Sequence, residues 1–356
     1  MALSMIVGAA KKKREQILAV DLGSRTTKAI HLERRGETFV LARYLLLDAP
    51  IFEKSMSPEM LTEHLRAVGQ AMETKTRQIS LTTNVNDALV RHVEMPRMPL
   101  DDMRLILKHN SRNYLQQDLV NHVFDCHMLP SGSGVTDANR AAGTIPKQKV
   151  LVAGGKQQMI DDYVAGARSA GLSAECIVPG IIGPVNAFEL AMPEAFTNEV
   201  VALVDIGFKS SSICILQQGE LILSRVVSIG GDRLTTAIAE SMNISYAEAE
   251  GIKLGMAGEV QAALESVLAP LGRELRASID FYEHQQDRAV SVAYLTGGST
   301  RSDFVVQSLQ QELLIEAKTW NPTSFLTLEL PPQQTGELEQ IAPQLAVAVG
   351  AGIAAL

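Results

Sequence analysis

Two stretches of the chain, one in each half, share the same order of apolar and polar positions. Residues 17–20 and 201–204 are apolar throughout, and each run leads into an Asp-x-Gly turn that starts at Asp21 or Asp205. Each turn is followed by a loop rich in Ser and Thr, a second apolar stretch and a Gly-Glu pair. Strands that are apolar at every position are typically buried on both faces. The pattern therefore predicts a duplicated β-hairpin and a chain of two similar lobes.

The turn of each predicted hairpin carries groups that suit a phosphate chain and a divalent cation. The Asp places a carboxylate at the end of a buried strand, and the following Gly lets the backbone approach a ligand closely. Hydroxyl and backbone N–H groups hold phosphate oxygens, and two facing aspartates suit Mg²⁺ held through water, because this cation dehydrates reluctantly. A single Asp-x-Gly turn is usually an ordinary hairpin, so the prediction depends on the duplication. The residues predicted to bind are Asp21, Gly23, Ser24, Arg25, Thr26 and Lys28 in the first hairpin and Asp205, Gly207, Lys209, Ser210 and Ser211 in the second, with Asp21 and Asp205 at the metal.

A third motif follows in the second half of the chain. Residues 290–295 are predicted to form a strand and a helix is predicted to begin near Ser302, with a Thr-Gly-Gly-Ser loop between them. Two glycines between a strand and a helix start let a flat base or a ribose lie against the backbone. Gly297, Gly298 and Ser299 are therefore predicted to contact the nucleoside part of the ligand.

Composition and charge narrow the function further. The chain has 356 residues, of which 46% are hydrophobic, and a net charge of -8. This length suits two lobes, and the charge argues against a nucleic-acid-binding surface, which needs a concentrated basic face. The 3 cysteines are far apart and the 7 histidines show no metal-ligand spacing. These patterns indicate reduced thiols in the cytosol and argue against a zinc site.

Neither end of the sequence reads as a membrane segment. The first ten residues are apolar and Lys11–Arg14 are basic, which is the reverse of a secretory signal. They are interpreted as a flexible leader, with weak attraction to a membrane surface as the alternative. No apolar run approaches the roughly 20 residues of a membrane span. The small-residue stretch Leu345–Leu356 is expected to form a closely packed buried helix.

Taken together, the three motifs resemble those of the actin-like ATPase superfamily. The segment that starts at Asp21 is similar to its first phosphate motif, the one that starts at Asp205 to its second, and the one that starts at Leu295 to its adenosine motif. From about Ile17 to the C-terminus, the chain resembles the PilM family of type IV pilus assembly proteins, which is related to the cell-division protein FtsA. The resemblance implies an α/β, two-lobed actin-like ATPase fold of duplicated ribonuclease-H-like domains, with an FtsA/PilM-type inserted subdomain in the first lobe. It also implies ATP (or ADP) and Mg²⁺ as ligands.

The segments that resemble the PilM family in particular lie between the two phosphate motifs. They are His92–Asp102, Ile106–Leu115 and Lys149–Lys156. The polar stretch Ser131–Lys149 is predicted to be a long hairpin loop. The resemblance divides the chain into a leader (1–14), a first-lobe core (15–96 and 166–198), the inserted subdomain (97–165), a second-lobe core (199–229 and 290–356) and an outer subdomain of the second lobe (230–289).

Two segments of the second lobe resemble nucleotide-contacting parts of the superfamily. Gly230, Gly231 and Asp232 are similar to a Gly-Gly-Asp turn that precedes a helix. Glu250 and Lys253 stand three residues apart and so share one face of a predicted helix. The resemblance implies that this pair reaches the ribose and adenine, and the alternative is an ion pair on the surface.

One stretch departs from the superfamily pattern. Members that hydrolyse ATP usually present a Glu or Asp, often before a proline, which orients the attacking water. Here Pro179 and Pro184 follow Val178 and Gly183. Without such a group the nucleophile is not oriented. We therefore expect tight ATP binding with very slow or absent hydrolysis.

The resemblance also implies a role and a partner. In the PilM family the inserted subdomain receives the N-terminal tail of a bitopic inner-membrane protein of the PilN type, here in a groove built from about Met98 to Tyr163. The chain is then a cytoplasmic scaffold, peripheral to the inner membrane, that also meets other pilus platform proteins. Its oligomeric state stays open, a homo-oligomer included.

Three alternatives share the fold. A small-molecule kinase needs a catalytic carboxylate near Pro179 or Pro184, and the sequence shows none there. A filament-forming tether like FtsA is expected to carry an amphipathic helix beyond the C-terminal core helix. A secretion-system relative of the GspL type is expected to continue into a membrane span.

Overall fold

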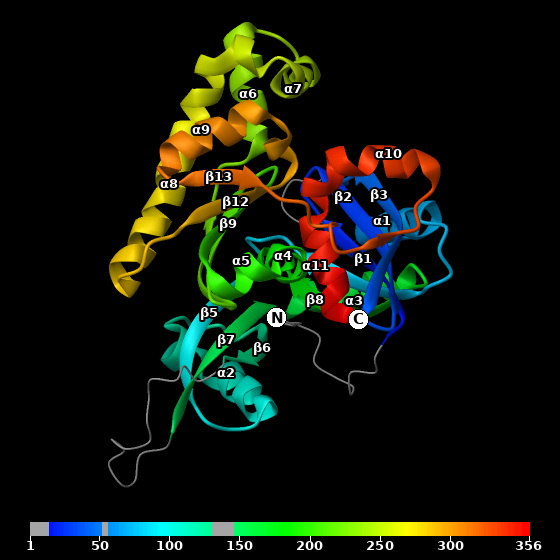
Figure 1. Cartoon of the computed structure of the whole chain (residues 1–356). Coiled ribbons are helices and arrows are strands. Elements are labelled where there is room, and N and C mark those ends of the chain that lie inside the picture. The colour runs from blue at the N-terminus through cyan, green and yellow to red at the C-terminus, as the bar shows by residue number, and fades with distance from the viewer. Residues whose placement is uncertain (1–13, 52–55, 130–145) are drawn as a thin grey trace.

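The computed structural model describes residues 14–51, 56–129 and 146–356. The predicted leader, apart from Arg14, and most of the predicted loop Ser131–Lys149 lie outside these residues. The described residues form three β-sheets with helices packed on them, arranged as two lobes and a smaller subdomain (Figure 1).

The first lobe is built on a six-stranded sheet with the strand order β14-β3-β2-β1-β4-β8. The strand bounds are β1 (Gln16–Leu22), β2 (Thr26–Arg35), β3 (Thr38–Asp48), β4 (Gln78–Thr83), β8 (Ser173–Pro179) and β14 (Thr327–Leu328). Alternate residues of β1 serve two cores: Leu18 and Val20 pack with helices α1 (Pro58–Ala71) and α3 (Gln157–Ser169), whereas Ile17 and Ala19 face the helices between the lobes. Strand β1 is therefore buried on both faces, as its apolar sequence predicted.

The second lobe repeats this design on a five-stranded sheet with the order β11-β10-β9-β12-β13. The strand bounds are β9 (Val200–Ile206), β10 (Ser211–Gln217), β11 (Glu220–Val227), β12 (Val292–Thr296) and β13 (Glu316–Thr319). Its helices are α6 (Gly231–Met242), α7 (Tyr246–Gly255), α8 (Gln261–Gln286) and α9 (Asp303–Leu313), which contribute to a second apolar core. Ser245 caps α7 through a reciprocal capping box with Glu248.

The predicted hairpin occurs once in each lobe and in the same register. Strand β1 pairs antiparallel with β2, which sets Asp21 opposite Lys28, and β9 pairs antiparallel with β10, which sets Asp205 opposite Ser212. Strand β1 also pairs in parallel with β4, and β9 pairs in parallel with β12. The duplication seen in the sequence is thus confirmed as two equivalent sheets.

Helices α4 (Gly183–Ala191) and α11 (Ala346–Ala355) pack against each other between the two sheets (Figure 1). Helix α11 lies on β1 and β2 of the first lobe, and α5 (Pro193–Asn198) lies on β9 and β10 of the second. The expectation of a closely packed C-terminal helix is confirmed, because nearly every residue of α11 is buried. By length and composition the segment Pro332–Ala355, which includes α10 (Pro332–Ile341), passes as a membrane span, but 61% of its apolar window is buried inside the protein.

The C-terminal segment corrects one predicted boundary. The sequence assigned all of 290–356 to the second-lobe core, yet β14 pairs with β3 and α11 packs on the first-lobe sheet. The physical reason is that apolarity predicts the burial of α11 but does not say which sheet buries it.

The inserted subdomain is a three-stranded sheet with the order β5-β7-β6, covered by α2 (Leu100–Leu115). Its strands are β5 (Ala88–Pro96), β6 (His122–Met128) and β7 (Lys147–Lys156). Strand β5 lies before the predicted start of the subdomain at 97. Most of α3 lies before the subdomain's predicted end at 165, yet α3 packs on α1 of the first lobe. The subdomain therefore corresponds to β5 through β7, because β5 pairs with β7 and with no strand of the first sheet.

Candidate functional site

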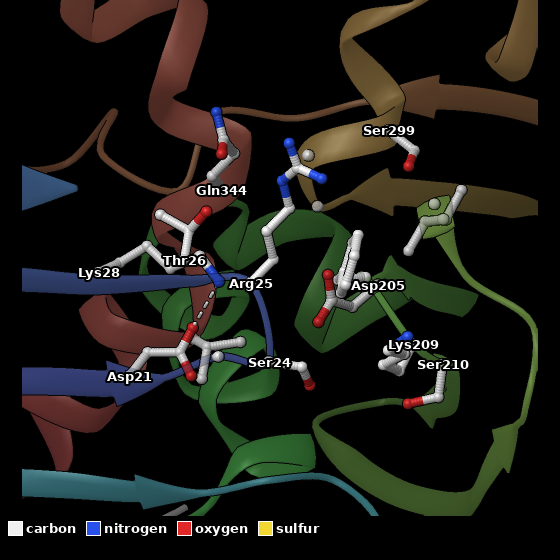
Figure 2. A pocket seen from close by; sticks show the side chains of 18 of the residues that line it. Asp21, Ser24, Arg25, Thr26, Lys28, Asp205, Lys209, Ser210, Ser299 and Gln344 are labelled. Atoms are coloured by element: carbon white, nitrogen blue, oxygen red, sulfur yellow. Dashed lines mark hydrogen bonds and ion pairs between the residues drawn. The ribbon is translucent and has the colours of Figure 1, made fainter. Parts of the chain in front are cut away.

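The ends of β1 and β9 meet at a cavity of about 220 Å³ between the two lobes. Figure 2 shows Asp21, Ser24, Thr26, Lys28 and Gln344 on one side of it and Asp205, Lys209, Ser210 and Ser299 on the other. Sixteen of the residues predicted from the sequence line this cavity: Asp21, Gly23, Ser24, Arg25, Thr26, Lys28, Asp205, Gly207, Lys209, Ser210, Gly231, Glu250, Lys253, Gly297, Gly298 and Ser299.

The two aspartates have different surroundings. Asp21 is 8% exposed and accepts hydrogen bonds from the Lys28 Nζ at 3.0 Å and from the Thr82 hydroxyl at 3.0 Å. Burial raises the pKa of Asp205 to about 6, the Lys28 ammonium acts against this rise, and the negative Asp21 adds to it. The two carboxylates offer the oxygen ligands that a divalent cation takes, and the Lys and Arg side chains of the same cavity balance their charge.

A backbone loop of the second lobe approaches the Asp205 carboxylate. Gly297 has a φ of +99°, and a Cβ there would stand 2.4 Å from the Ile206 carbonyl oxygen and 2.6 Å from Asp205 Oδ1. Only glycine fits this position. The 3₁₀ turn η4 (Gly298–Arg301) and then α9 follow, so the predicted strand, Gly-Gly loop and helix are all present.

The predicted pair on α7 is a partly buried ion pair in the cavity wall, not a surface pair. Lys253 Nζ lies 2.8 Å from Glu250 Oε2 and donates to the Thr235 hydroxyl at 2.9 Å. Burial acts against ionisation of Glu250, but the hydrogen bonds from Lys253 and Thr235 outweigh it and lower the pKa of this carboxyl. The pair presents one fixed cation and one fixed anion to the cavity.

Arg25 reaches from the first lobe to aromatic rings of the second. Its guanidinium carbon lies 5.3 Å from the centroid of the Phe208 ring and 5.3 Å from that of the Tyr246 ring, within the range of cation–π attraction. In Figure 2 the Arg25 side chain extends across the middle of the cavity. Arg25 therefore connects the turn that follows β1 to both subdomains of the second lobe.

Three predicted residues lie beside the cavity and not in its wall. Ser211 donates its hydroxyl to the Ile229 carbonyl at 2.7 Å, because side chains alternate along β10 and Ser210 and Ser212 take the cavity side. Gly230 packs beneath the turn that holds Gly207, where a Cβ would stand 2.6 Å from the Gly207 carbonyl oxygen. Asp232 forms an ion pair with Lys209 at 2.6 Å and so positions that lysine.

The cavity also contains residues that the sequence prediction missed. Among them are Thr83, Asn84, Phe208, Arg301 and Gln344. Thr83 and Asn84 end a strand parallel to β1, so polar residues at the end of that strand were a usable signal. Nothing local marks Gln344, because it reaches the site only through the return of the C-terminal segment to the first lobe.

The wall next to Pro179 is formed by Gly180 and contributes no carboxylate. The cavity wall has three carboxylates among the described residues, Asp21, Asp205 and Glu250. Asp21 is paired with Lys28 and Glu250 with Lys253, and none of the three carboxylates belongs to the stretch that follows β8.

Two duplicated lobes, a cavity between them and an Asp-bearing turn from each define the actin-like ATPase fold. The family model for the type IV pilus assembly protein PilM matches residues 19–355. The chain therefore belongs to the PilM family of type IV pilus assembly proteins.

The chain is also similar to individual proteins. The chain resembles a solved PilM–PilN type IV pilus biogenesis complex, with a TM-score of 0.82, 23% identity and coverage of 97% of this chain and 99% of the other. It resembles MreB5 of Spiroplasma citri bound to ADP, with a TM-score of 0.51, 10% identity and coverage of 87% and 93%. It is 28% identical over 119 residues to the cell division protein FtsA of Bacillus subtilis (strain 168), a match that spans 33% of this chain and 26% of that relative.

Proposed function

We propose that this protein is an ATP- and Mg²⁺-binding scaffold of the type IV pilus inner-membrane platform, which binds the N-terminal tail of a PilN-type membrane protein. The observation that carries the proposal is the convergence of Asp21 and Asp205, one from each lobe, on a single cavity. The match to the PilM family supports the pilus role. The proposed place is the cytoplasmic face of the inner membrane.

The residues of the cavity fit a magnesium nucleotide. Ser24, Thr26 and Ser210 supply hydroxyl groups and Lys28 and Lys209 supply cations for the phosphates. The aspartates suit Mg²⁺ held partly through water, and Glu250, Lys253 and the Gly297–Gly298 backbone suit the nucleoside. Because the stretch after β8 lacks a water-orienting carboxylate, the nucleotide is proposed to act as a structural ligand that holds the lobes together.

A second cavity of about 760 Å³ offers a site for the tail. Its walls come from β5, β6 and β7 of the inserted subdomain and from β11 and α8 of the second lobe. The Phe281 ring, 53% exposed, stands at its edge and provides an aromatic anchor for an apolar peptide side chain. A peptide bound here would contact both lobes, so the nucleotide that closes the lobes would also shape its site.

The test is capture of a synthetic peptide with the sequence of the PilN-type tail, measured with and without Mg²⁺ and ATP. We expect Phe281→Ala to weaken peptide binding on the order of thirtyfold, because an aromatic anchor that the peptide buries contributes about 2 kcal/mol. Leu314→Ala is the matched control, since Leu314 is 79% exposed and lies outside both cavities. A peptide that wild-type protein does not bind, or that binds Phe281→Ala unchanged, would contradict the proposed site.

A further inference from the structure

Arg25 is the residue through which the turn that follows β1 reaches the second lobe. Its guanidinium carbon lies 5.3 Å from the ring centroid of Phe208, which follows β9, and 5.3 Å from that of Tyr246, the first residue of α7. Figure 2 shows the Arg25 side chain crossing the cavity between the lobes. The two rings attract the guanidinium by cation–π interaction and so place a cation of the first lobe against the second.

The second lobe fixes these two rings through contacts of its own. Ser245 caps α7 and so sets the position of Tyr246, whose hydroxyl donates to Asp232 Oδ1 at 2.9 Å. Asp232 Oδ2 accepts from Lys209 Nζ at 2.6 Å, and the same Nζ lies 5.1 Å from the centroid of the Phe208 ring. The rings therefore form a seat for the guanidinium that the second lobe builds without help from the first.

The N–H groups of Arg25 are open to a ligand. Within the part of the chain that the structure describes, the guanidinium forms no hydrogen bond and no ion pair, and the residue is exposed in the wall of the cavity. The carboxylates of Asp232 and Glu250 lie nearby, but each already accepts hydrogen bonds from two side chains of the second lobe. The planar guanidinium fork matches the oxygens of a phosphate group.

The guanidinium acts on the nucleoside side of the cavity. Tyr246, which it contacts, lies one helical turn before Glu250 on α7. Burial acts against ionisation of Glu250, but hydrogen bonds and nearby cations, Arg25 among them, lower the pKa of this carboxyl. At Asp205 burial raises the pKa, and the cation that acts against this rise is Lys28. Arg25 and Lys28 thus serve different ends of the site, although both belong to the first hairpin.

We propose that Arg25 clamps the nucleotide across the lobes: Phe208 and Tyr246 hold its guanidinium over the cavity, and its N–H groups donate to the phosphate next to the ribose. This inference rests on the proposed nucleotide site and deepens it by assigning the phosphate that Arg25 recognises. That phosphate lies between the cation side and the nucleoside side of the ligand, where Arg25 crosses the cavity. AMP, ADP and ATP all carry it, so the clamp does not depend on the terminal phosphate.

The first experiment measures the affinities of the full chain for ATP, ADP and AMP with Mg²⁺, by displacement of a fluorescent ATP analogue. Arg25→Ala is expected to weaken binding of all three by the same factor, on the order of tenfold, because hydrogen bonds between charged groups are the stronger ones. Adenosine is expected to bind this variant as it binds the wild type. A loss confined to ATP, or to ATP and ADP, would place Arg25 on an outer phosphate, and an equal loss for adenosine would place it on the nucleoside; either result would overturn the inference.

The control for Arg25 is an arginine outside the cavity. Arg273 of α8 is exposed and does not line the site, so Arg273→Ala is expected to keep the wild-type affinities. Wild-type affinities in Arg25→Ala would overturn the inference. A wild-type chain that binds none of these ligands would overturn the proposed function itself.

The second experiment tests the rings with a double-mutant cycle. Tyr246→Leu is expected to weaken ATP binding about threefold, the effect of a cation–π contact at an exposed site, and to cause no further loss when combined with Arg25→Ala. Tyr246→Phe keeps the ring and is expected to bind ATP as the wild type does. Phe208→Leu removes the other ring, is expected to give the same pattern, and decides the question if Tyr246→Leu does not fold. A loss of the same size with and without Arg25 would show that the rings do not act through Arg25 and would contradict the proposed clamp.

Discussion

Asp205→Asn is expected to weaken binding of Mg²⁺ and ATP on the order of 100-fold. The substitution keeps the size of the side chain but removes one of the two carboxylates at the junction of the lobes, and losing one member of a buried charged contact has effects of about 2–5 kcal/mol. Calorimetric titration of the nucleotide with Mg²⁺ measures the loss. Asp118→Asn, an exposed carboxylate outside the cavity, is the matched control and is expected to bind as the wild type does.

The same substitution is expected to raise the stability of the ligand-free protein. Burial raises the pKa of Asp205 to about 6 from an ordinary value of 3.8, so the folded protein holds this proton more tightly than the unfolded chain does. The stability that the protonated Asp205 carboxyl contributes to the folded protein is fully present below pH 3.8 and is lost as the pH rises through about 6. At pH 7.5 without ligand, Asp205→Asn should therefore unfold with a free energy higher by on the order of 3 kcal/mol, and most of the gain should be lost at pH 4. A lower stability at pH 7.5 would contradict this account of Asp205.

Gly350→Ala is expected to lower the free energy of unfolding by about 3 kcal/mol or more. A Cβ at Gly350 of α11 would stand 1.7 Å from the Gly183 carbonyl oxygen and 2.9 Å from the Gly183 Cα. Both atoms belong to the backbone, so no rotamer change relieves the overlap and the pair of helices between the lobes must separate. Denaturant unfolding measures the effect.

A glycine with open surroundings provides the control for Gly350. Gly336 lies in α10, and a Cβ there would have no atom within 4 Å. Gly336→Ala is expected to stabilise the protein by about 0.5 kcal/mol, because alanine favours the helix and restricts the unfolded chain. Opposite signs for these two substitutions support the packing account, and a neutral Gly350→Ala would contradict it.

The residues of the candidate site were predictable because most of them belong to short segments, two of which repeat in the sequence. Asp21 and Asp205 follow apolar strands at equivalent positions, and Gly297 follows a third apolar strand. The ends of these strands indicate that all three residues lie along one edge of the sheets. The alternation of side chains along β10 was the missed detail, because it turns Ser211 away from the cavity and brings in Ser212. Strand periodicity would have shown this once the start of β10 was known.

The assembly of distant segments was not predictable in the same way. Nothing in the sequence of β14 or α11 shows that they return to the first lobe, and nothing in β5 shows that it leaves the first sheet. Apolar patterns predict that these segments are buried, whereas the choice of sheet depends on which surfaces the rest of the chain leaves uncovered. Gln344 is missed for this reason, since it follows α10 and lies just before α11.

We expect a turn from each lobe to hold the same phosphate chain and its cation. The most direct measurement is a structure of the protein bound to Mg²⁺ and a non-hydrolysable ATP analogue. The predicted result places the phosphates between Ser24 and Ser210, with the cation beside Asp21 and Asp205 and the adenosine against Gly297. A nucleotide bound elsewhere, or one that leaves either aspartate without contact to the cation or its waters, would contradict the claim.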